Sequence, residues 1–591
     1  MVEGAKRDTW GGKAEFLLSC IGYAVGLGTI WRFPYVCYQG GGAAFLIPYT
    51  IYLLLFGIPL IMLEMGLGQF SNKGPIGVWE ISPLFKGVGY AMCIICGITS
   101  VYYNVIISWT LYFFTQSFRS PLPWSNCNNT WNNPETCRVV FSRNSTDNFT
   151  ISKTCEVNQT IIQTPSEQFW ERNVLQLSSG IENLGGLKKT WHLFLANAVA
   201  WILVFLCLIK GIKSSGKVVY ITVTFPYIVL ITFFIRAVTL DGASDGLWFY
   251  FVPKWSKLLD FEPWSKAAMQ LFYSMGAAWG SLITFSSYNK YKNNFYRDAI
   301  IVGLTDTLTA IFAGMVIFCI IGFMSKQTGL DIEDVVVQGP GLVFVVYPEA
   351  ITQFPGPKNF WAVLFFIFLF TVGIDSQFGM IETMMTTLVD ELPKKASKAK
   401  IFLTMFVCFV GLILGIPCVT QGGMYFLHIM DWYASTFSLM IISFIECVVI
   451  AWIYGVNKFR SDTASMLGHN LSMYWIFSWK FISPALILFV FISAVVKHKS
   501  VTYGCYVYPG WAVSIGWMFA LCSILVIPAV AVYSILCHAK GTFVQRVKML
   551  LRPTDNWKPA IDEEQEPHEH QKLSESAFNN SDSGEVTNSK A

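Results

Sequence analysis

The sequence predicts an all-α membrane protein with twelve transmembrane helices, in which helices 1–5 and 6–10 form two inverted repeats. Its mean hydropathy is +0.49 and only 13% of its residues are charged, against about 25% in soluble domains. Apolar segments of about 20 residues, the length that crosses a bilayer, recur along the chain. Glycine and polar residues interrupt the first and sixth of these segments. The twelve segments are 15–37, 43–68, 87–117, 191–209, 218–241, 265–289, 299–323, 360–388, 399–416, 424–454, 472–497 and 512–537.

The first segment contains residues that weaken a membrane-spanning helix. Gly22, Gly26 and Gly28 precede Arg32 and Pro34. In a helix interior glycine costs about 1 kcal/mol and proline about 3 kcal/mol, and a charge at mid-membrane is also costly. Irregular backbone is tolerated there only where it is buried in protein or lines a cavity. We therefore expect helix 1 to be unwound at mid-membrane and to face a polar site.

The sixth segment repeats this feature in the stretch SMGAAWGSLITFSS, residues 274–287. Gly276, Gly280 and several small polar residues interrupt an otherwise apolar span. Two interrupted helices five segments apart indicate inverted repeats, with helices 1 and 6 unwound and a binding site between them.

The chain divides into a cytoplasmic N-terminal segment (1–13), a transporter domain (14–540) and a cytoplasmic, largely disordered tail (541–591). Basic clusters follow alternate connections, so the positive-inside rule places both termini in the cytoplasm. The polar start of the chain is not a cleavable signal peptide. A net charge of +4, from 41 basic and 37 acidic residues, gives no electrostatic footprint for nucleic acid. The lipid bilayer is the expected surrounding.

A long polar insert, about 118–190, lies on the opposite side of the membrane from the termini. Glycosylation is expected there, and Cys127 and Cys137 are the cysteines expected to form a disulfide in an oxidising compartment. Cys155 has no obvious partner. The four glycosylation sequons begin at Asn128, Asn144, Asn148 and Asn158.

A series of sequence motifs extends from residue 6 to about residue 555. The motifs are RDTWGGKAEFLLSCIGYAVGLG, WRFPY, GGGAAFLIPY, LGQF, VYYNVI, SSYNKY, GIDSQF and VTQGG. With them the chain resembles the neurotransmitter:sodium symporter family, the sodium- and chloride-dependent transporters. AAWG at 277–280, SSYNKY and YPGWAV are similar to its glycine transporters and its broad neutral and cationic amino acid transporter.

The resemblance implies where the substrate binds. Family members for monoamines have Asp where this chain has Gly26, whereas amino acid transporters have Gly, which lets a substrate carboxylate reach the unwound backbone. The N–H groups of Leu27 and Gly28 would receive that carboxylate, with the Tyr103 hydroxyl as a further donor. Close helix packing is the alternative explanation for Gly26, and an interfacial aromatic role is the alternative for Tyr103.

The implied pocket is small. Trp279 stands where many members have Phe, so its indole leaves room for glycine or alanine. Gly276 opens space beside the substrate amine, where an N-methyl group would fit. The full implied set is Ala24, Gly26, Leu27, Gly28, Thr99, Tyr103, Tyr273, Ser274, Gly276 and Trp279.

Two sodium sites are also implied. The second matches the family pattern, in which backbone carbonyls, a carboxylate and a hydroxyl supply the oxygen ligands that a hard cation prefers. Its residues are Gly22, Val25, Val372, Asp375 and Ser376. Pairing of Asp375 with a buried base is the alternative, although the eighth segment holds no Lys or Arg.

The first sodium site departs from the pattern, because Thr29 and Asp306 replace two asparagines. Its implied residues are Ala24, Thr29, Ser274 and Asp306, together with the substrate carboxylate. Tyr49, Gln270 and Ser274 match the family's chloride ligands, but the usual serine there is Ala310. Asp306 lies four residues before Ala310, so the two share a helix face.

An ionised Asp306 beside this position would take over the role of chloride. We therefore expect weakened chloride dependence and altered cation selectivity. A protonated Asp306, favoured by burial, is the alternative.

The family's gates map onto charged residues within this chain. Arg32 and Asp431 match the outer pair, which closes with Tyr103 and Tyr273. The inner gate maps onto Arg7 and Asp390, with Tyr288 and Glu382 nearby. Buried charges in spans are functional by default, and a merely structural salt bridge is the alternative.

The function predicted is sodium-coupled symport of a small neutral amino acid, glycine first, at the plasma membrane. The alternatives are a broad-specificity transporter with relaxed cation selectivity and a transport-inactive amino acid sensor. An enzyme is not predicted, because nucleotide loops, nucleophile motifs and metal-spaced His/Cys clusters are missing from the sequence. Oligomeric state is left open.

Overall fold

The structure, a computed structural model, describes residues 8–139, 163–329, 331–332, 341–354, 356–392, 400–496 and 501–560. Its strands are β1 (Thr502–Tyr503) and β2 (Tyr506–Val507), an antiparallel pair. Its helices, with 3₁₀ and π turns labelled η, are α1 (Lys13–Ala24), η1 (Gly28–Arg32), α2 (Phe33–Gln39), α3 (Ala43–Tyr52), η2 (Leu53–Gly57), α4 (Ile58–Ser71), η3 (Gly77–Ile81), η4 (Pro83–Phe85), α5 (Lys86–Gln116), α6 (Pro165–Gln168), η5 (Phe169–Val174), α7 (Leu187–Leu208), α8 (Ile212–Val238), α9 (Ala243–Phe251), η6 (Trp255–Leu259), α10 (Phe261–Met275), α11 (Ser281–Ser286), α12 (Phe295–Thr328), η7 (Leu342–Val346), α14 (Tyr347–Thr352), α15 (Lys358–Glu391), α17 (Lys400–Leu414), η8 (Ile416–Val419), α18 (Gly423–Val448), η9 (Val449–Gly455), α19 (Val456–Leu467), α20 (Met473–Phe477), η10 (Ser478–Ile482), α21 (Ser483–Val496), α22 (Gly510–Cys537) and α23 (Phe543–Leu550).

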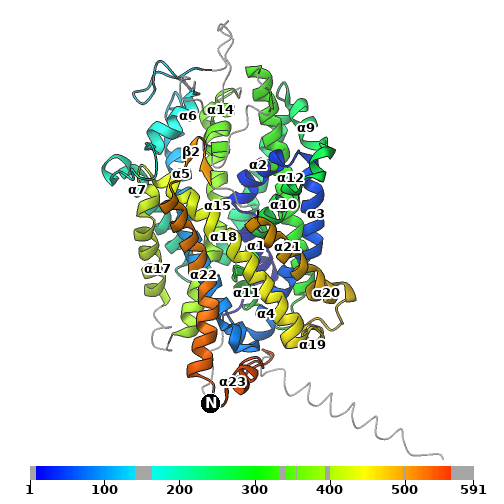
Figure 1. Ribbon diagram of the computed structural model, residues 1–591. Coiled ribbons are helices and arrows are strands. Elements are labelled where there is room, and N and C mark those ends of the chain that lie inside the picture. Colours follow the sequence, from blue (N-terminus) through cyan, green and yellow to red (C-terminus); the bar gives the residue numbers. More distant parts are fainter. Residues whose placement is uncertain are drawn as a thin grey trace, which may run out of the picture.

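These helices account for all twelve predicted spans and form one bundle (Figure 1). Within the described residues, nine helices are long and apolar enough to cross a membrane, and α1 with its continuation Gly28–Gln39 makes a tenth span bent by 47°. The other two are the interrupted sixth segment, α10 and α11, and the short ninth segment, α17. The chain is therefore an all-α, multi-pass membrane protein.

The packing of helices 1–5 is mirrored by that of helices 6–10. α1 of helix 1 packs against α8 of helix 5, just as α10 of helix 6 packs against α18 of helix 10. α5 of helix 3 packs against α18, and α15 of helix 8 packs against α8. Exchanging the two groups of five preserves these contacts, as an inverted repeat requires.

Both predicted breaks are present. In helix 1, α1 ends at Ala24, and the helix resumes at Gly28 as a π turn. In helix 6 the break lies between Met275 and Ser281, and three of its residues, Gly276, Ala278 and Gly280, have φ values of +65°, +68° and +77°. Glycine adopts this left-handed region without strain, whereas Ala278 needs support from its surroundings.

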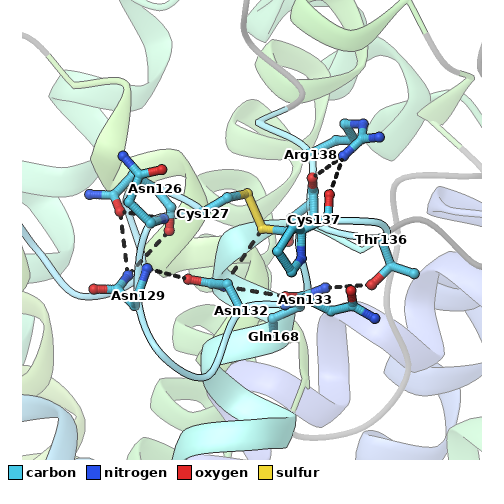
Figure 2. Close-up of a disulfide and its surroundings, with 12 residues drawn as sticks. Asn126, Cys127, Asn129, Asn132, Asn133, Thr136, Cys137, Arg138 and Gln168 are labelled. Carbon is cyan, nitrogen blue, oxygen red and sulfur yellow. Dashed lines mark hydrogen bonds between the residues drawn. A yellow bond between two sulfur atoms is a disulfide. The ribbon is translucent and has the colours of Figure 1, made fainter.

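One end of the bundle, the insert end, carries α6, η5, α14 and the β1–β2 pair (Figure 1). The predicted disulfide between Cys127 and Cys137 is present there. Figure 2 shows it closing a turn in which Asn129 is hydrogen-bonded to Asn126 and Asn132. Cys505, next to β2, is disulfide-bonded as well.

The sequon asparagine Asn128 is exposed in this loop. Cys155, Asn144, Asn148 and Asn158 lie outside the described residues.

The opposite end, the tail end, carries α23 (Figure 1). After α23 the chain docks against the bundle, with the indole of Trp557 packed against Phe70 of α4 at 5.4 Å and against Tyr454 of η9 at 6.3 Å. Trp557 Nε1 donates to the Tyr454 hydroxyl at 3.2 Å. The ammonium of Lys73 donates to the Asn556 carbonyl at 2.8 Å. The first part of the tail is thus ordered, and residues 561–591 lie outside the described part.

Candidate functional site: a cavity between two broken helices

A cavity lies where the breaks of helices 1 and 6 face each other. All the predicted substrate residues except Leu27 line it: Ala24, Gly26, Gly28, Thr99, Tyr103, Tyr273, Ser274, Gly276 and Trp279. Leu27 reaches the site through its backbone, because its N–H donates to the Tyr103 hydroxyl at 3.1 Å. Two of the three groups predicted to receive a carboxylate, the Leu27 N–H and the Tyr103 hydroxyl, are therefore neighbours in the structure.

The glycines of helix 1 allow side chains to approach the broken backbone closely. A Cβ atom at Gly26 would lie 2.6 Å from Ser376 Oγ and 3.1 Å from the Tyr103 hydroxyl. At Gly28 it would lie 2.4 Å from the Tyr273 ring. Close packing, the alternative explanation for Gly26, is thus a property of this site as well, and it brings the donor groups together.

Two cavity residues were missed from the sequence. Tyr23 lines the cavity beside Gly276, where a Cβ atom would lie 2.2 Å from its ring. Met380 also lines it and lies four residues after Ser376 on α15. That spacing, which puts two residues on one helix face, was the available signal for Met380. No local pattern indicated Tyr23.

The predicted second cation site lies beside a neighbouring cavity. Gly22, Val25, Val372 and Asp375 line this cavity, and Ser376 Oγ donates to the Tyr23 carbonyl at 3.2 Å. Residues of the broken end of helix 1, a carboxylate and a hydroxyl therefore lie together, and carboxylate and hydroxyl oxygens are ligands suited to a hard cation.

Asp375 has a partner that the sequence did not reveal. Thr222 of α8 donates its hydroxyl hydrogen to Asp375 Oδ1 at 2.6 Å. Both residues are buried. A hydroxyl, and not a buried base, therefore orients the carboxylate.

The residues of the predicted first cation site also come together. Ser274 Oγ lies 2.8 and 2.9 Å from the two carboxylate oxygens of Asp306, and Thr29 Oγ1 lies 3.4 Å from Oδ1. The hydroxyls of Thr29 and Ser274 are 3.3 Å apart. Asp306 is fully buried, so the whole oxygen cluster is shielded from solvent. Ala24, at the broken end of α1, lines the substrate cavity together with Thr29 and Ser274.

The predicted chloride position contains several buried polar atoms. They are the Tyr49 hydroxyl, Gln270 Oε1 and Thr307 Oγ1, and the Tyr49 hydroxyl interacts with those of Ser274 and Thr307. Gln270 Nε2 donates to the Gly28 carbonyl at 3.4 Å. Tyr49 also interacts electrostatically with Asp306. Hydroxyl groups and the carboxyl of Asp306 thus share one buried space.

The outer gate residues are near one another without forming an ion pair. The Arg32 guanidinium lies over the Tyr273 ring, 4.4 Å from its centroid, and its Nη1 has no hydrogen-bond partner among the described residues. Asp431 accepts a hydrogen bond from the Tyr102 hydroxyl at 3.0 Å. The structure does not pair Arg32 with Asp431.

The residues of the inner gate region, by contrast, form direct hydrogen bonds and an ion pair with one another. The Tyr288 hydroxyl lies 3.2 Å from Glu382 Oε1, and Lys400 Nζ lies 3.3 Å from the same oxygen. Trp10 donates from Nε1 to the Phe285 carbonyl at 2.9 Å and packs against the Tyr288 ring.

The other inner pair is only partly within the described residues. Asp390 Oδ2 accepts the Gly74 N–H at 3.0 Å, and Arg7 lies outside the described part. Sequence analysis also missed an ion pair nearby, between Lys13 of α1 and buried Asp298 of α12, 3.2 Å apart.

The described residues contain no group of three or more His, Cys, Asp or Glu side chains that could hold a metal ion. The oxygen clusters above instead combine one carboxylate each with hydroxyls and carbonyls. A multi-pass helical bundle with a small polar cavity between two broken helices defines a class of protein, the membrane transporters.

Comparison with known proteins gives the family. A family profile described as the sodium:neurotransmitter symporter family matches residues 7–538. The chain is 45% identical to the sodium- and chloride-dependent glycine transporter 1 of Xenopus laevis, over 95% of this chain and 89% of the relative. It is 43% identical to the human sodium- and chloride-dependent neutral and basic amino acid transporter B(0+), over 95% and 90%. It is also 43% identical to the human sodium- and chloride-dependent taurine transporter, over 95% and 89%.

This protein therefore belongs to the sodium:neurotransmitter symporter family. It is a transporter and not an enzyme, as the sequence predicted.

Proposed function

We propose that this protein is a sodium-coupled symporter that imports a small neutral amino acid, glycine first, across the plasma membrane. The observation that carries the proposal is the hydrogen bond between the Leu27 N–H and the Tyr103 hydroxyl at the break in helix 1. A substrate carboxylate would take the place of this contact and receive a hydrogen bond from each group. Gly26 leaves the approach open, as an Asp at this position would not.

The far side of the cavity supports a small substrate. Trp279 is 4% exposed and occupies the side of the cavity where a substrate side chain would extend. Gly276 opposes it beside Tyr23. Because relatives of nearly equal identity carry names for glycine, taurine, and neutral and basic amino acids, cavity size is the better guide to the substrate.

The same geometry supports a coupling mechanism. Sodium at the two oxygen clusters would order the broken ends of helices 1 and 6 around the substrate. One sodium ion moving inward down 100 mV releases about 2.3 kcal/mol before any concentration term. Rocking of helices 1, 2, 6 and 7 against the rest would then alternate access. Asp306 would supply the negative charge that chloride supplies in relatives.

The proposed orientation places both termini in the cytoplasm. It is supported by the position of α23 at the tail end and of the disulfide with its exposed sequon Asn128 at the insert end. Broad amino acid specificity with relaxed cation selectivity is the second candidate, favoured by the carboxylate of Asp306 in the first cation site.

Radiolabelled uptake in cells expressing the chain tests these proposals. Sodium is replaced in turn by lithium, potassium and choline, and chloride by gluconate, with alanine, leucine, proline and lysine as competitors. Sodium-dependent glycine uptake that resists leucine and lysine is the expected result. Strong inhibition by both would favour the broad-specificity candidate, and absence of uptake for every amino acid would contradict symport.

A single substitution sharpens the substrate test. Trp279→Phe enlarges the cavity, so leucine should inhibit glycine uptake more strongly than in the wild type. Trp255→Phe, at a site that is 66% exposed, is the matched control and should leave the competition unchanged.

A further inference from the structure

Two carboxyl groups are buried next to the break in helix 6, outside both cavities. Glu64 lies on α4 of helix 2 and Glu446 on α18 of helix 10, and both are fully buried. Neither lines the substrate cavity or the cavity at the second cation site. The transport mechanism proposed above uses neither residue.

Glu64 holds the broken backbone of helix 6. Its Oε1 accepts a hydrogen bond from the N–H of Ala278, the residue with φ +68°. Ala278 immediately precedes Trp279, which lines the substrate cavity. The carboxyl therefore stabilises a left-handed residue that would otherwise be strained, and it does so one residue away from the substrate site.

The remaining oxygen atoms of the pair have no hydrogen-bond partner among the described residues. These are Glu64 Oε2 and both carboxyl oxygens of Glu446. The two carboxyls interact electrostatically with each other. The titratable neighbours that act on them are Tyr23 of α1, Cys96 of α5 and Cys447 of α18, and none of these is basic.

Two ionised carboxylates are strongly disfavoured in a buried site whose titratable neighbours are not basic. Buried like charges repel strongly at low dielectric, and carboxyl pairs that share a site retain a proton. The Ala278 N–H stabilises negative charge on Glu64, while Glu446 has no donor. Of the two carboxyls, Glu446 therefore holds a proton more tightly than Glu64.

We propose that Glu64 and Glu446 form a proton-binding site that holds one proton, carried by Glu446, and that this proton keeps the helix 6 break in its transport-competent form. The ligand is the proton itself. Loss of the proton would place two negative charges beside Ala278, push the carboxyls apart and displace Trp279. The proposal concerns the state of the break and does not depend on which amino acid is carried.

Infrared spectroscopy of the full-length protein in lipid nanodiscs tests the site directly. The wild type should show the C=O stretching band of a protonated carboxylic acid at neutral pH. Glu446→Gln should remove that contribution, whereas Glu64→Gln should keep it. Glu262→Gln, on the exposed start of α10, is the control and should leave the spectrum unchanged. A Glu446→Gln spectrum that retains the full wild-type band would overturn the proposal.

Uptake measured against pH tests the role of the proton. Wild-type uptake should fall as pH is raised on both sides of the membrane, whereas Glu446→Gln, a neutral isostere of the protonated acid, should keep its neutral-pH rate over the same range. If uptake by the wild type and by Glu446→Gln changed identically as pH is raised, the proposed coupling between the proton and the helix 6 break would be refuted. If Glu446→Gln fails to reach the cell surface, the Glu64→Gln spectrum decides, because loss of the band there would place the proton on Glu64 and contradict the assignment.

Discussion

The two candidate cation sites are built on the same plan but differ in what surrounds their carboxylates. Asp375 is held by one hydroxyl, that of Thr222 on helix 5, and lies beside a cavity lined largely by apolar side chains. Asp306 is held by Ser274 and Thr29, in the space that also contains the buried hydroxyls of Tyr49 and Thr307 at the chloride position.

The comparison indicates a division of labour between the sites. We propose that the carboxylate at the second site serves the cation alone, whereas Asp306 serves a cation and replaces an anion. Substituting each carboxylate and its partners separates these roles.

Removing the second-site carboxylate should have the largest effect. Asp375→Asn leaves a buried cation without its counter-charge, and removing one partner of a buried ion pair costs about 3–5 kcal/mol. We expect sodium affinity to fall by about 100-fold or more. Sodium titration of uptake measures this, with surface labelling as the control for folding. A sodium dependence like that of the wild type would show that Asp375 is not a cation ligand.

Restoring the family's asparagine at position 306 and its serine at position 310 should make uptake depend on chloride. Wild-type uptake should persist when gluconate replaces chloride, because Asp306 supplies the negative charge. The double variant Asp306→Asn with Ala310→Ser should lose about tenfold or more of its uptake without chloride, because a neutral amide cannot balance the cation. Ala310→Ser alone is the matched control and should remain chloride-independent. Wild-type uptake abolished by chloride removal would disprove this role for Asp306.

Removing the hydroxyl that orients Asp375 should have a moderate effect. Thr222→Val deletes a hydrogen bond to a charged group, and such bonds contribute about 1.5–3 kcal/mol. The sodium concentration for half-maximal uptake should rise by about 10-fold or more. Thr224→Val, two residues further along the same helix and exposed, is the control. Equal effects of the two substitutions would assign Thr222 a purely structural role.

Glu349, a buried carboxyl outside the membrane, can be compared with the carboxylates of the two cation sites. Its substitution should have the smallest effect of those proposed here. Glu349 of α14 is 2% exposed, and Ser166 N–H donates to it at 3.4 Å. Burial raises the pKa of Glu349 from 4.5 to about 7. The folded state thus binds the proton more tightly than the unfolded state, so this contribution to stability is full below about pH 4.5, is lost as pH rises to about 7, and is constant above.

Glu349→Gln should remove that pH dependence. The thermal midpoint of the variant at pH 8 should exceed that of the wild type by on the order of a few °C. At pH 4.5 the two midpoints should be similar. A pH profile of stability that is identical in the two proteins would contradict the raised pKa.

The sequence predicted the helix breaks because glycine and Arg32 inside the first segment are costly in a membrane helix unless they face a site. The carboxylates Asp375 and Asp306 were assigned through the family resemblance. The partner of Asp375 was not predictable in this way. Thr222 and Asp375 are 153 residues apart, and a threonine in an apolar helix carries no local signal.

The gate residues show the same limit of prediction from sequence. Motif matching placed Arg32 and Asp431 together, but it could not show that the guanidinium lies on the Tyr273 ring instead. The choice between an ion pair and a cation–π contact depends on how far the two sides of the cavity have closed, and that is a property of the packed structure.

The docking of Trp557 between helices 2 and 10 has a practical consequence for work with this protein. Its indole lies between the ends of two helices, so an expression clone that stops after helix 12 would leave Phe70 and Tyr454 facing water. A fluorescent protein or purification tag joined before residue 557 would do the same. A tag joined after residue 560 would leave Trp557 packed between these two helices.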